Sequence, residues 1–236
     1  WHLPIIINEE GKKLSKRDFG FSLDDLRNSG FLEEAICNYL AIIGGSFKKE
    51  IMNLEELSKE LNFEEIASTS KIRYDVEKLR WVNHSWIKLL SLQDLTKRAR
   101  PFIENKFEKA KSLSDSQLET LLKFVHIELF TLEDSTKMLS FYFEKPEINS
   151  ELLKQHNLEN YKNIIKLALE AGYTSDAQKF MDFVQSECKK NNLAGKDIYA
   201  ILRLALMGVE NGPSIKDLIN MLGAQEAQAR FEVVIT

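Results

Sequence analysis

Apolar residues recur at helical spacing through most of the chain. In residues 32–43 they stand at positions i, i+3, i+4, i+7, i+8 and i+11, and two glycines follow. A stripe of this kind covers one face of a helix, which must be buried against a core. Similar stripes occur in residues 177–188 and 215–222. The three stripes consist of Leu32, Ala35, Ile36, Tyr39, Leu40 and Ile43, then Ala177, Phe180, Met181, Val184 and Cys188, then Ile215, Leu218, Ile219 and Leu222.

Polar pairs three residues apart predict where helices begin. A side-chain oxygen at the first position of such a pair satisfies an amide of the first helical turn, which otherwise has no partner. Gly30 and Gly223 stand where left-handed helix ends are expected. These patterns together predict about ten to twelve helices. The pairs are Ser22 with Asp25, Asn53 with Glu56, Ser91 with Asp94, Ser114 with Gln117, and Thr131 with Asp134.

Strand patterns are confined to about the first fifteen residues. The β-branched run Ile5–Ile7 is followed by a turn-like segment at residues 8–11. No repeat of about 33 to 45 residues is found, which argues against a helical solenoid. We therefore predict an all-α fold of irregular helical bundles with a short β segment at the N-terminus. The expected breaks fall in residues 46–53, 90–94 and 146–151.

Composition narrows the class without deciding the function. The chain has 236 residues, 44% of them hydrophobic and 29% charged, as in ordinary folded globular proteins. The formal charge of -4 excludes a uniformly basic nucleic-acid binder but not a local basic surface. The chain begins at Trp1 rather than Met, directly before an apolar run, and we expect it to be a piece of a longer protein.

Cysteine and histidine spacing favours neither a metal site nor a disulfide framework. Cys37 and Cys188 are far apart, and His84, His126 and His156 are scattered without ligand spacing. No apolar run approaches the roughly 20 residues that span a bilayer, and no signal-peptide pattern appears. We expect a cytoplasmic protein with no membrane contact and no metal bound through these residues.

A dense cationic segment directly follows the predicted strand and turn. Residues 12–17 place four basic side chains in six positions, which alone is typical of a solvated surface. Residues 13–17, Lys-Leu-Ser-Lys-Arg, resemble the Lys-Met-Ser-Lys-Ser signature of class I aminoacyl-tRNA synthetases. Further blocks resemble bacterial-type glutamyl-tRNA synthetases and occur in that family's order over nearly the whole chain. They are residues 2–4 with 8–11, residues 30–35 with 38–40, residues 74–83, and residues 203–208 with 212–213.

The sequence departs from the family pattern at several positions. Asp18 and Phe19 stand where the family often has His-Gly, Gly45 where it often has Trp, and Ile201 where a Pro is common. These departures concern local contacts, whereas the order of the blocks supports the resemblance.

The resemblance implies activation of glutamate by ATP, with Mg²⁺, to glutamyl-adenylate and its transfer to tRNA(Glu). Lys13, Ser15 and Lys16 match the signature's catalytic positions, and Lys16 is expected to contact ATP, because an ammonium stabilises charge developing on the phosphates. The His-Ile-Gly-His-type motif is absent from this sequence, so we expect the chain alone to be inactive. A monomer is expected.

The resemblance also implies a domain order. Residues 1–20 correspond to the end of the catalytic domain, 21–90 to a helical stem-contact region, and 91–148 and 149–236 to two anticodon-binding subdomains.

Two regions are candidates for binding tRNA. Residues 97–111, which include Arg98 and Arg100, carry a local charge of +4 and could contact phosphates. The alternative is a solvated helix face with ion pairs. By resemblance, Arg203, Pro213 and Ile215 lie against the anticodon, and the alternative for Arg203 is a salt bridge within its helix.

Large aromatic residues have a structural interpretation. Tyr74, Trp81 and Trp86 are expected to fill core positions rather than to stack on bases, because large aromatics dominate core burial. A different class of function also remains open. The chain could be an all-helical protein-interaction module in which the lysine-rich loop has no catalytic role.

Overall fold

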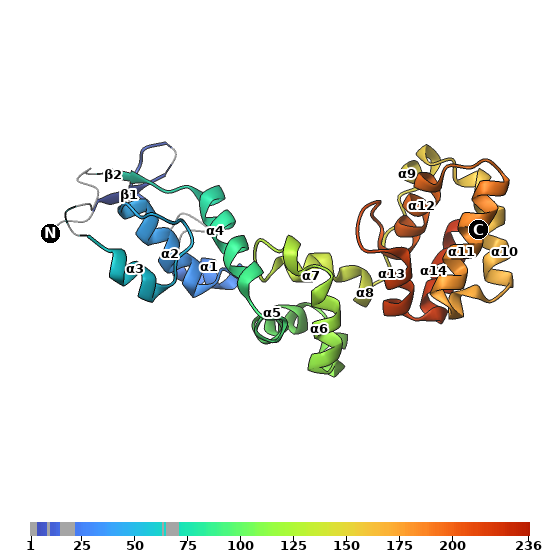
Figure 1. The fold of residues 1–236 in the computed structure, drawn as a ribbon, viewed down its shortest axis with the longest axis horizontal. Helices are drawn as coiled ribbons and strands as arrows, with labels where there is room; N and C mark the ends of the chain where they lie inside the picture. The colour runs from blue at the N-terminus through green and yellow to red at the C-terminus, as the bar shows by residue number, and fades with distance from the viewer. Residues whose placement is uncertain (1–3, 9, 15–21, 63, 65–70) are drawn as a thin grey trace. The chain divides into compact units, whose positions relative to one another are not determined.

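The computed structural model describes residues 4–8, 10–14, 22–62, 64 and 71–236, and the chain forms two compact units, Trp1–Met138 and Leu139–Thr236 (Figure 1). The predicted all-α fold with a short β segment is confirmed, with fourteen α-helices and a two-stranded sheet among the described residues. None of the helices in this part of the chain is long and apolar enough to cross a membrane. The division into residues 1–20, 21–90, 91–148 and 149–236 stays a prediction.

The first unit contains seven of these helices and both strands. Short 3-10 helices connect several of them, including η2 (Glu108–Ser112) and η3 (His126–Glu128). The strands are β1 (Ile5–Ile7) and β2 (Lys71–Arg73), and the helices are α1 (Leu23–Asn28), α2 (Glu33–Gly44), α3 (Leu54–Glu60), α4 (Val76–Leu89), α5 (Leu92–Lys106), α6 (Asp115–Lys123) and α7 (Asp134–Met138).

The small sheet corrects one expectation. β1 pairs in parallel with β2, with Ile5 opposite Lys71 and Ile7 opposite Arg73. The sequence indicated no strand at β2, because Lys-Ile-Arg is too short and too polar to show an alternating pattern. The strand forms because β1 presents an edge to which it can hydrogen-bond, and this partner lies about seventy residues earlier in the chain.

Predicted caps define the starts of the helices in this unit. Complete capping boxes begin α1, α3 and α6 at Ser22, Asn53 and Ser114. The Ser91 side chain accepts a hydrogen bond from the amide of Asp94 at the start of α5. These caps confirm four of the predicted helix starts.

The helices of the first unit are joined through a buried asparagine. α2 packs against α3 and α4, and α5 packs against α6 and α7. Asn83 of α4 is fully buried; its Oδ1 accepts from the Leu32 amide at 2.8 Å and its Nδ2 donates to the Phe130 carbonyl at 2.6 Å. The side chain thereby ties the start of α2 to the segment before α7, and replaces hydrogen bonds that these backbone groups would otherwise make with water.

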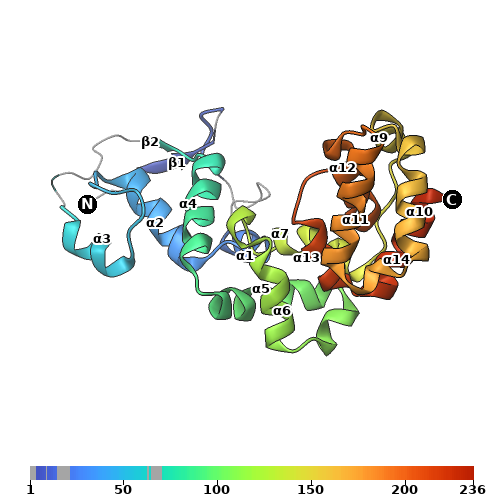
Figure 2. The ribbon, with the colours of Figure 1, turned by 45° about the vertical axis from the view of Figure 1, so that its right-hand side comes forward.

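The second unit is a bundle of the remaining helices (Figure 2). α14 packs against α10, α12 and α13, and α11 packs against α10 and α13. All five apolar residues of the stripe in residues 177–188 are buried, as predicted. The helices are α8 (Ser140–Phe143), α9 (Ser150–Gln155), α10 (Lys162–Glu170), α11 (Ala177–Lys190), α12 (Gly195–Met207), α13 (Ile215–Leu222) and α14 (Ala224–Ile235), with η4 (Leu158–Asn160) and η5 (Tyr173–Ser175) between them.

Candidate nucleic-acid interface

The lysine-rich segment begins on a hairpin at the edge of the sheet. The amide of Asn8 donates to the Lys12 carbonyl at 2.8 Å, and Gly11 has a φ of 79° in the turn. Lys13 then pairs back with Ile7 in an antiparallel bridge, and its side chain is exposed. Ser15 and Lys16 lie outside the described residues. The catalytic roles predicted for Lys13, Ser15 and Lys16 therefore stay predictions.

Two arginines of the basic segment on α5 make contacts within the protein. Arg98 forms two hydrogen bonds with the carboxylate of Glu34, at 3.0 and 2.8 Å. These hydrogen bonds lower the pKa of Glu34, although partial burial opposes the shift. Arg100 bonds Glu104 at 2.7 Å and Asp115 at 2.6 Å. A bidentate guanidinium–carboxylate pair has fixed geometry, so Arg98 joins α5 to α2.

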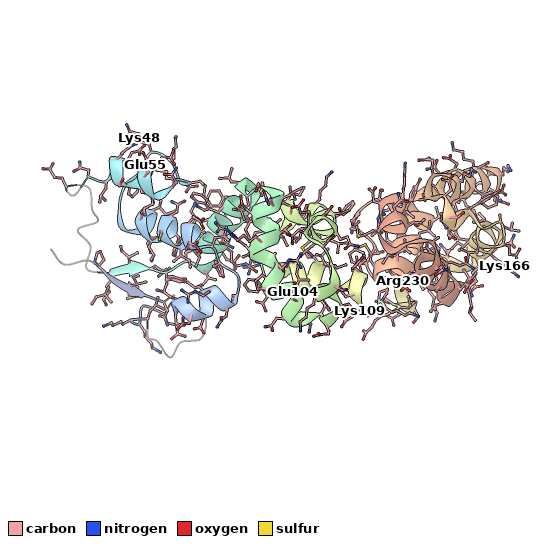
Figure 3. The ribbon with its side chains drawn as sticks, turned by 90° about the horizontal axis from the view of Figure 1, so that it is seen from below. Lys48, Glu55, Glu104, Lys109, Lys166 and Arg230 are labelled. Carbon is pink, nitrogen blue, oxygen red and sulfur yellow. The ribbon has the colours of Figure 1, made fainter. Side chains whose placement is uncertain are left out.

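The pair of Arg100 with Glu104, four positions apart, is of the kind expected from the alternative for residues 97–111, a solvated helix face with ion pairs, whereas Arg98 pairs with a different helix. Glu104 and Lys109, at the end of α5 and in η2, can be located in Figure 3. Lys97 and Lys106 are exposed on the same segment and remain suited to phosphate contact. RNA binding by Arg98 and Arg100 stays a prediction. Each guanidinium would have to contact the RNA while it remains paired with a carboxylate of the protein.

In the second unit, Arg203 contacts the loop that follows its own helix. Its Nε donates to the Pro213 carbonyl at 3.2 Å and its Nη1 to the Glu210 carbonyl at 3.4 Å. These contacts differ from the salt bridge within the helix that was the alternative for Arg203. The guanidinium is half-buried and supports the backbone of residues 209–213, which we call the α12–α13 loop.

Glycines give this loop its shape. Gly208 ends α12 with a φ of 78°, and a Cβ there would lie 3.1 Å from the Cβ of Pro146. Gly212 has a φ of 152°, and a Cβ there would lie 2.9 Å from the Met207 sulfur. Positive φ and close contacts both favour glycine. The loop is therefore preformed, and it exposes Val209 and Asn211.

The other predicted residues of this region differ in exposure. Pro213 is partly exposed in the loop, whereas the side chain of Ile215 is 2% exposed at the start of α13. Ile215 therefore anchors the loop to the bundle through its side chain, and a side-chain contact with a base would require its release. The contacts of both residues with tRNA stay predictions.

A cluster around His156 was missed at the level of sequence. Its two ring nitrogens face carboxylates of Asp197, in the first turn of α12, and Glu210, in the α12–α13 loop. These two residues are separated from the histidine by 41 and 54 positions. Only the tertiary structure brings them together, and no spacing rule could have signalled the cluster.

One aromatic prediction is wrong. Tyr74 is buried, and Trp86 is partly buried and donates its indole N–H to Asn38 at 3.0 Å. Trp81, however, is 40% exposed on α4, and the Lys78 ammonium lies 4.3 Å from the centroid of its ring. Trp81 faces away from the core because the buried stripe of α4 passes through Leu79, Val82 and Asn83 instead.

Two known protein families match the sequence of this chain. Residues 94–235 match the family described as anticodon binding domain, and residues 1–81 match the catalytic domain of class I tRNA synthetases (E and Q). The chain belongs to the anticodon-binding-domain family. The basic residues 97–111 and the α12–α13 loop both lie inside the region matched to the anticodon binding domain.

The relatives named below are all described as glutamate–tRNA ligases. The chain is 32% identical over 99% of its length to glutamate–tRNA ligase 1 of Pseudothermotoga lettingae, and 29% identical over 98% to glutamate–tRNA ligase of Finegoldia magna. A crystal structure of a glutamate tRNA ligase from Elizabethkingia meningosepticum, in complex with its amino acid, superposes with a TM-score of 0.85 at 25% identity, over 99% of this chain and 50% of that one.

The resemblance to bacterial-type glutamyl-tRNA synthetases is thus confirmed. The chain spans about half the length of the curated relatives it matches, with 49% and 48% of the two named ligases covered.

Proposed function

We propose that this chain is the tRNA-holding part of a glutamate–tRNA ligase, and that the complete enzyme activates glutamate with ATP and transfers it to tRNA(Glu). The observation that carries this proposal is the match of residues 94–235 to an anticodon binding domain, directly after a class I catalytic match over residues 1–81. The named relatives, all glutamate–tRNA ligases, support the choice of amino acid.

The α12–α13 loop is the proposed anticodon-side contact. Unpaired loop bases are recognised by hydrogen bonds to their edges and by stacking, which requires groups held in a fixed geometry. The exposed amide side chain of Asn211 can supply such hydrogen bonds, and Arg203 fixes the backbone on either side of it. We propose that Arg203 acts by supporting the loop.

The hairpin is the proposed nucleotide side. An exposed ammonium at Lys13 suits a phosphate, and Lys16, three positions later, is the proposed contact for the charge that develops on ATP during glutamate activation. Mg²⁺ is expected to arrive on the phosphates of ATP. Glu10, the described carboxylate of this hairpin, is paired with Lys12 at 2.9 Å and is a poor choice for a metal ligand.

Filter binding tests the tRNA proposal on the chain as it is. We expect saturable binding of tRNA(Glu) that weakens steeply with salt, because cationic side chains displace counterions from the phosphates. A tRNA(Glu) transcript with a changed anticodon is the matched control, and it should bind more weakly. Equal affinity for both transcripts would rule out recognition of the anticodon, whereas binding to protein partners alone would support an all-helical protein-interaction module. We also propose a monomer in the cytoplasm that does not form glutamyl-adenylate without the rest of the enzyme.

A further inference from the structure

His156 lies between two carboxylates that belong to different elements. It caps the C-terminus of α9, and its side chain is only 14% exposed. Its Nδ1 lies 2.8 Å from Oδ1 of Asp197, and its Nε2 lies 2.5 Å from Oε1 of Glu210. The imidazole therefore joins α9, the first turn of α12 and the α12–α13 loop.

This geometry specifies the protonation state of the ring. A neutral imidazole has one N–H donor, so one of its nitrogens would present a lone pair to a carboxylate oxygen. The imidazolium donates to both carboxylates at once, and each of these hydrogen bonds is charge-assisted. The hydrogen bonds to Asp197 and then to Glu210 raise the pKa of His156, while partial burial opposes the shift.

The charged and titratable groups around the ring are consistent with a cation at this place. Asp197 on α12 and Glu210 in the loop supply two negative charges. The hydroxyl of Tyr161, next to η4, donates to the Ala194 carbonyl just before α12. Burial raises the pKa of that tyrosine, and the nearby charge of Asp197 adds to the shift. Arg203 binds the Glu210 carbonyl from the side of α12.

Glu210 is thus held at two points by two cations. Its backbone carbonyl accepts from Arg203, and its carboxylate accepts from His156. Between Glu210 and Pro213, which Arg203 also holds, lie the exposed residues Asn211 and Gly212. Removing the His156 contact leaves the Glu210 side chain without its partner from α9, while both Arg203 contacts remain.

We propose that His156, as an imidazolium, is a positioning residue that holds the α12–α13 loop in its tRNA-binding shape, and that rising pH releases this hold. This inference rests on the proposed function, since it assigns the regulation of the same loop.

The direction of the pH effect follows from linkage. The pKa of His156 is raised in the folded protein, so its stabilising contribution is fully present below the pKa of an unfolded histidine. The contribution is lost as the pH rises through the folded-state value. The loop should therefore be held most firmly at mildly acidic to neutral pH, and tRNA binding should weaken at more basic pH.

The first experiment measures tRNA(Glu) affinity against pH at constant ionic strength. We expect the unsubstituted chain to lose about threefold to tenfold in affinity between about pH 6 and about pH 9, as one charge-assisted contact is lost. His156→Gln should bind weakly at low pH and lack this part of the pH dependence, and Glu210→Gln should behave similarly. His126→Gln is the matched control, because His126 bonds the Ile87 carbonyl in the other unit, and it should keep the original profile.

The second experiment needs no RNA. The chain has four histidines, and the His156 imidazole resonance is the one missing from the His156→Gln spectrum. We expect the pKa read from this resonance to lie above that of an ordinary histidine and to be lower in Glu210→Gln. The amide resonances of Asn211 and Gly212 should shift over the same pH range. An ordinary pKa for His156, or loop amide resonances that do not shift over this pH range, would overturn the proposal that His156 holds the loop, whatever the RNA-binding result.

The outcomes separate the two proposals. If the unsubstituted chain shows no preference for tRNA(Glu) at any pH, the proposed function is wrong. If it does prefer tRNA(Glu), and a folded His156→Gln chain shows the same affinity and the same pH profile, the positioning role of His156 is wrong while the proposed function stands.

Discussion

At the scale of single residues, two glycines with the same φ angle have different constraints. Gly11 and Gly30 both have a φ of 79°. A Cβ at Gly11 would meet nothing within 4 Å, whereas at Gly30 it would lie 2.6 Å from the Glu133 amide nitrogen. The Gly30 carbonyl also accepts from the Leu132 amide at 2.9 Å. Gly30 is therefore required for backbone-to-backbone packing as well as for its turn.

Gly30→Ala should destabilise the first unit by about 3 kcal/mol or more, because neither backbone can move away cheaply. Gly11→Ala, the matched control, should cost about 1 kcal/mol, the penalty of a left-handed alanine. Tryptophan fluorescence during denaturant unfolding measures this, since all three tryptophans of the chain lie in residues 1–138. Equal losses in the two variants would mean that the close approach at Gly30 relaxes without cost.

At the scale of elements, a buried arginine joins three helices of the second unit. Arg230 of α14, labelled in Figure 3, is 4% exposed. Its Nη1 donates to the carbonyls of Leu206, at the end of α12, and Phe141, in α8. Its Nε bonds Glu226 at 2.7 Å. Helix C-termini leave carbonyls without partners, and this guanidinium satisfies them where water has no access.

Arg230→Lys should destabilise the second unit by about 2 to 4 kcal/mol, because an ammonium cannot reach both carbonyls and the carboxylate together. Denaturant unfolding followed by helical circular dichroism checks the loss. Arg27→Lys, at a highly exposed site on α1, should leave the unfolding curve unchanged. An unaltered curve for Arg230→Lys would show that the lysine finds an equivalent set of partners.

At the scale of the whole molecule, the catalytic prediction requires the complete enzyme. In it, Lys16→Ala should lower the rate of pyrophosphate exchange by about a hundredfold or more, since a positioned charge stabilises the transition state. tRNA(Glu) affinity should stay near its original value, because the substitution lies outside the region matched to the anticodon binding domain.

Lys12→Ala is the control for that measurement. Lys12 neighbours the same motif, is exposed and is paired with Glu10, so its loss should change exchange only slightly. Unchanged exchange in Lys16→Ala would remove Lys16 from the mechanism.

Local chemistry along the chain determined most of the elements, independently of their tertiary contacts. Ser22, Asn53 and Ser114 begin helices because a capping box is satisfied by residues three positions apart. The stripe from Ala177 to Cys188 is buried for a similar reason, since helical periodicity places these residues on one face whatever packs against it. The order of the family blocks likewise depends on sequence alone.

Tertiary structure decided the features that join distant residues. β2 exists because β1 offers it an edge, and Trp81 is exposed because α4 buries a different face. Arg98 and Arg203 hold Glu34 and the α12–α13 loop, and His156 meets carboxylates 41 and 54 positions away. A periodic pattern predicts which side of a helix is apolar. The partner of a charged side chain such as Arg98 lies in a distant segment, and only the folded structure shows which segment packs beside it.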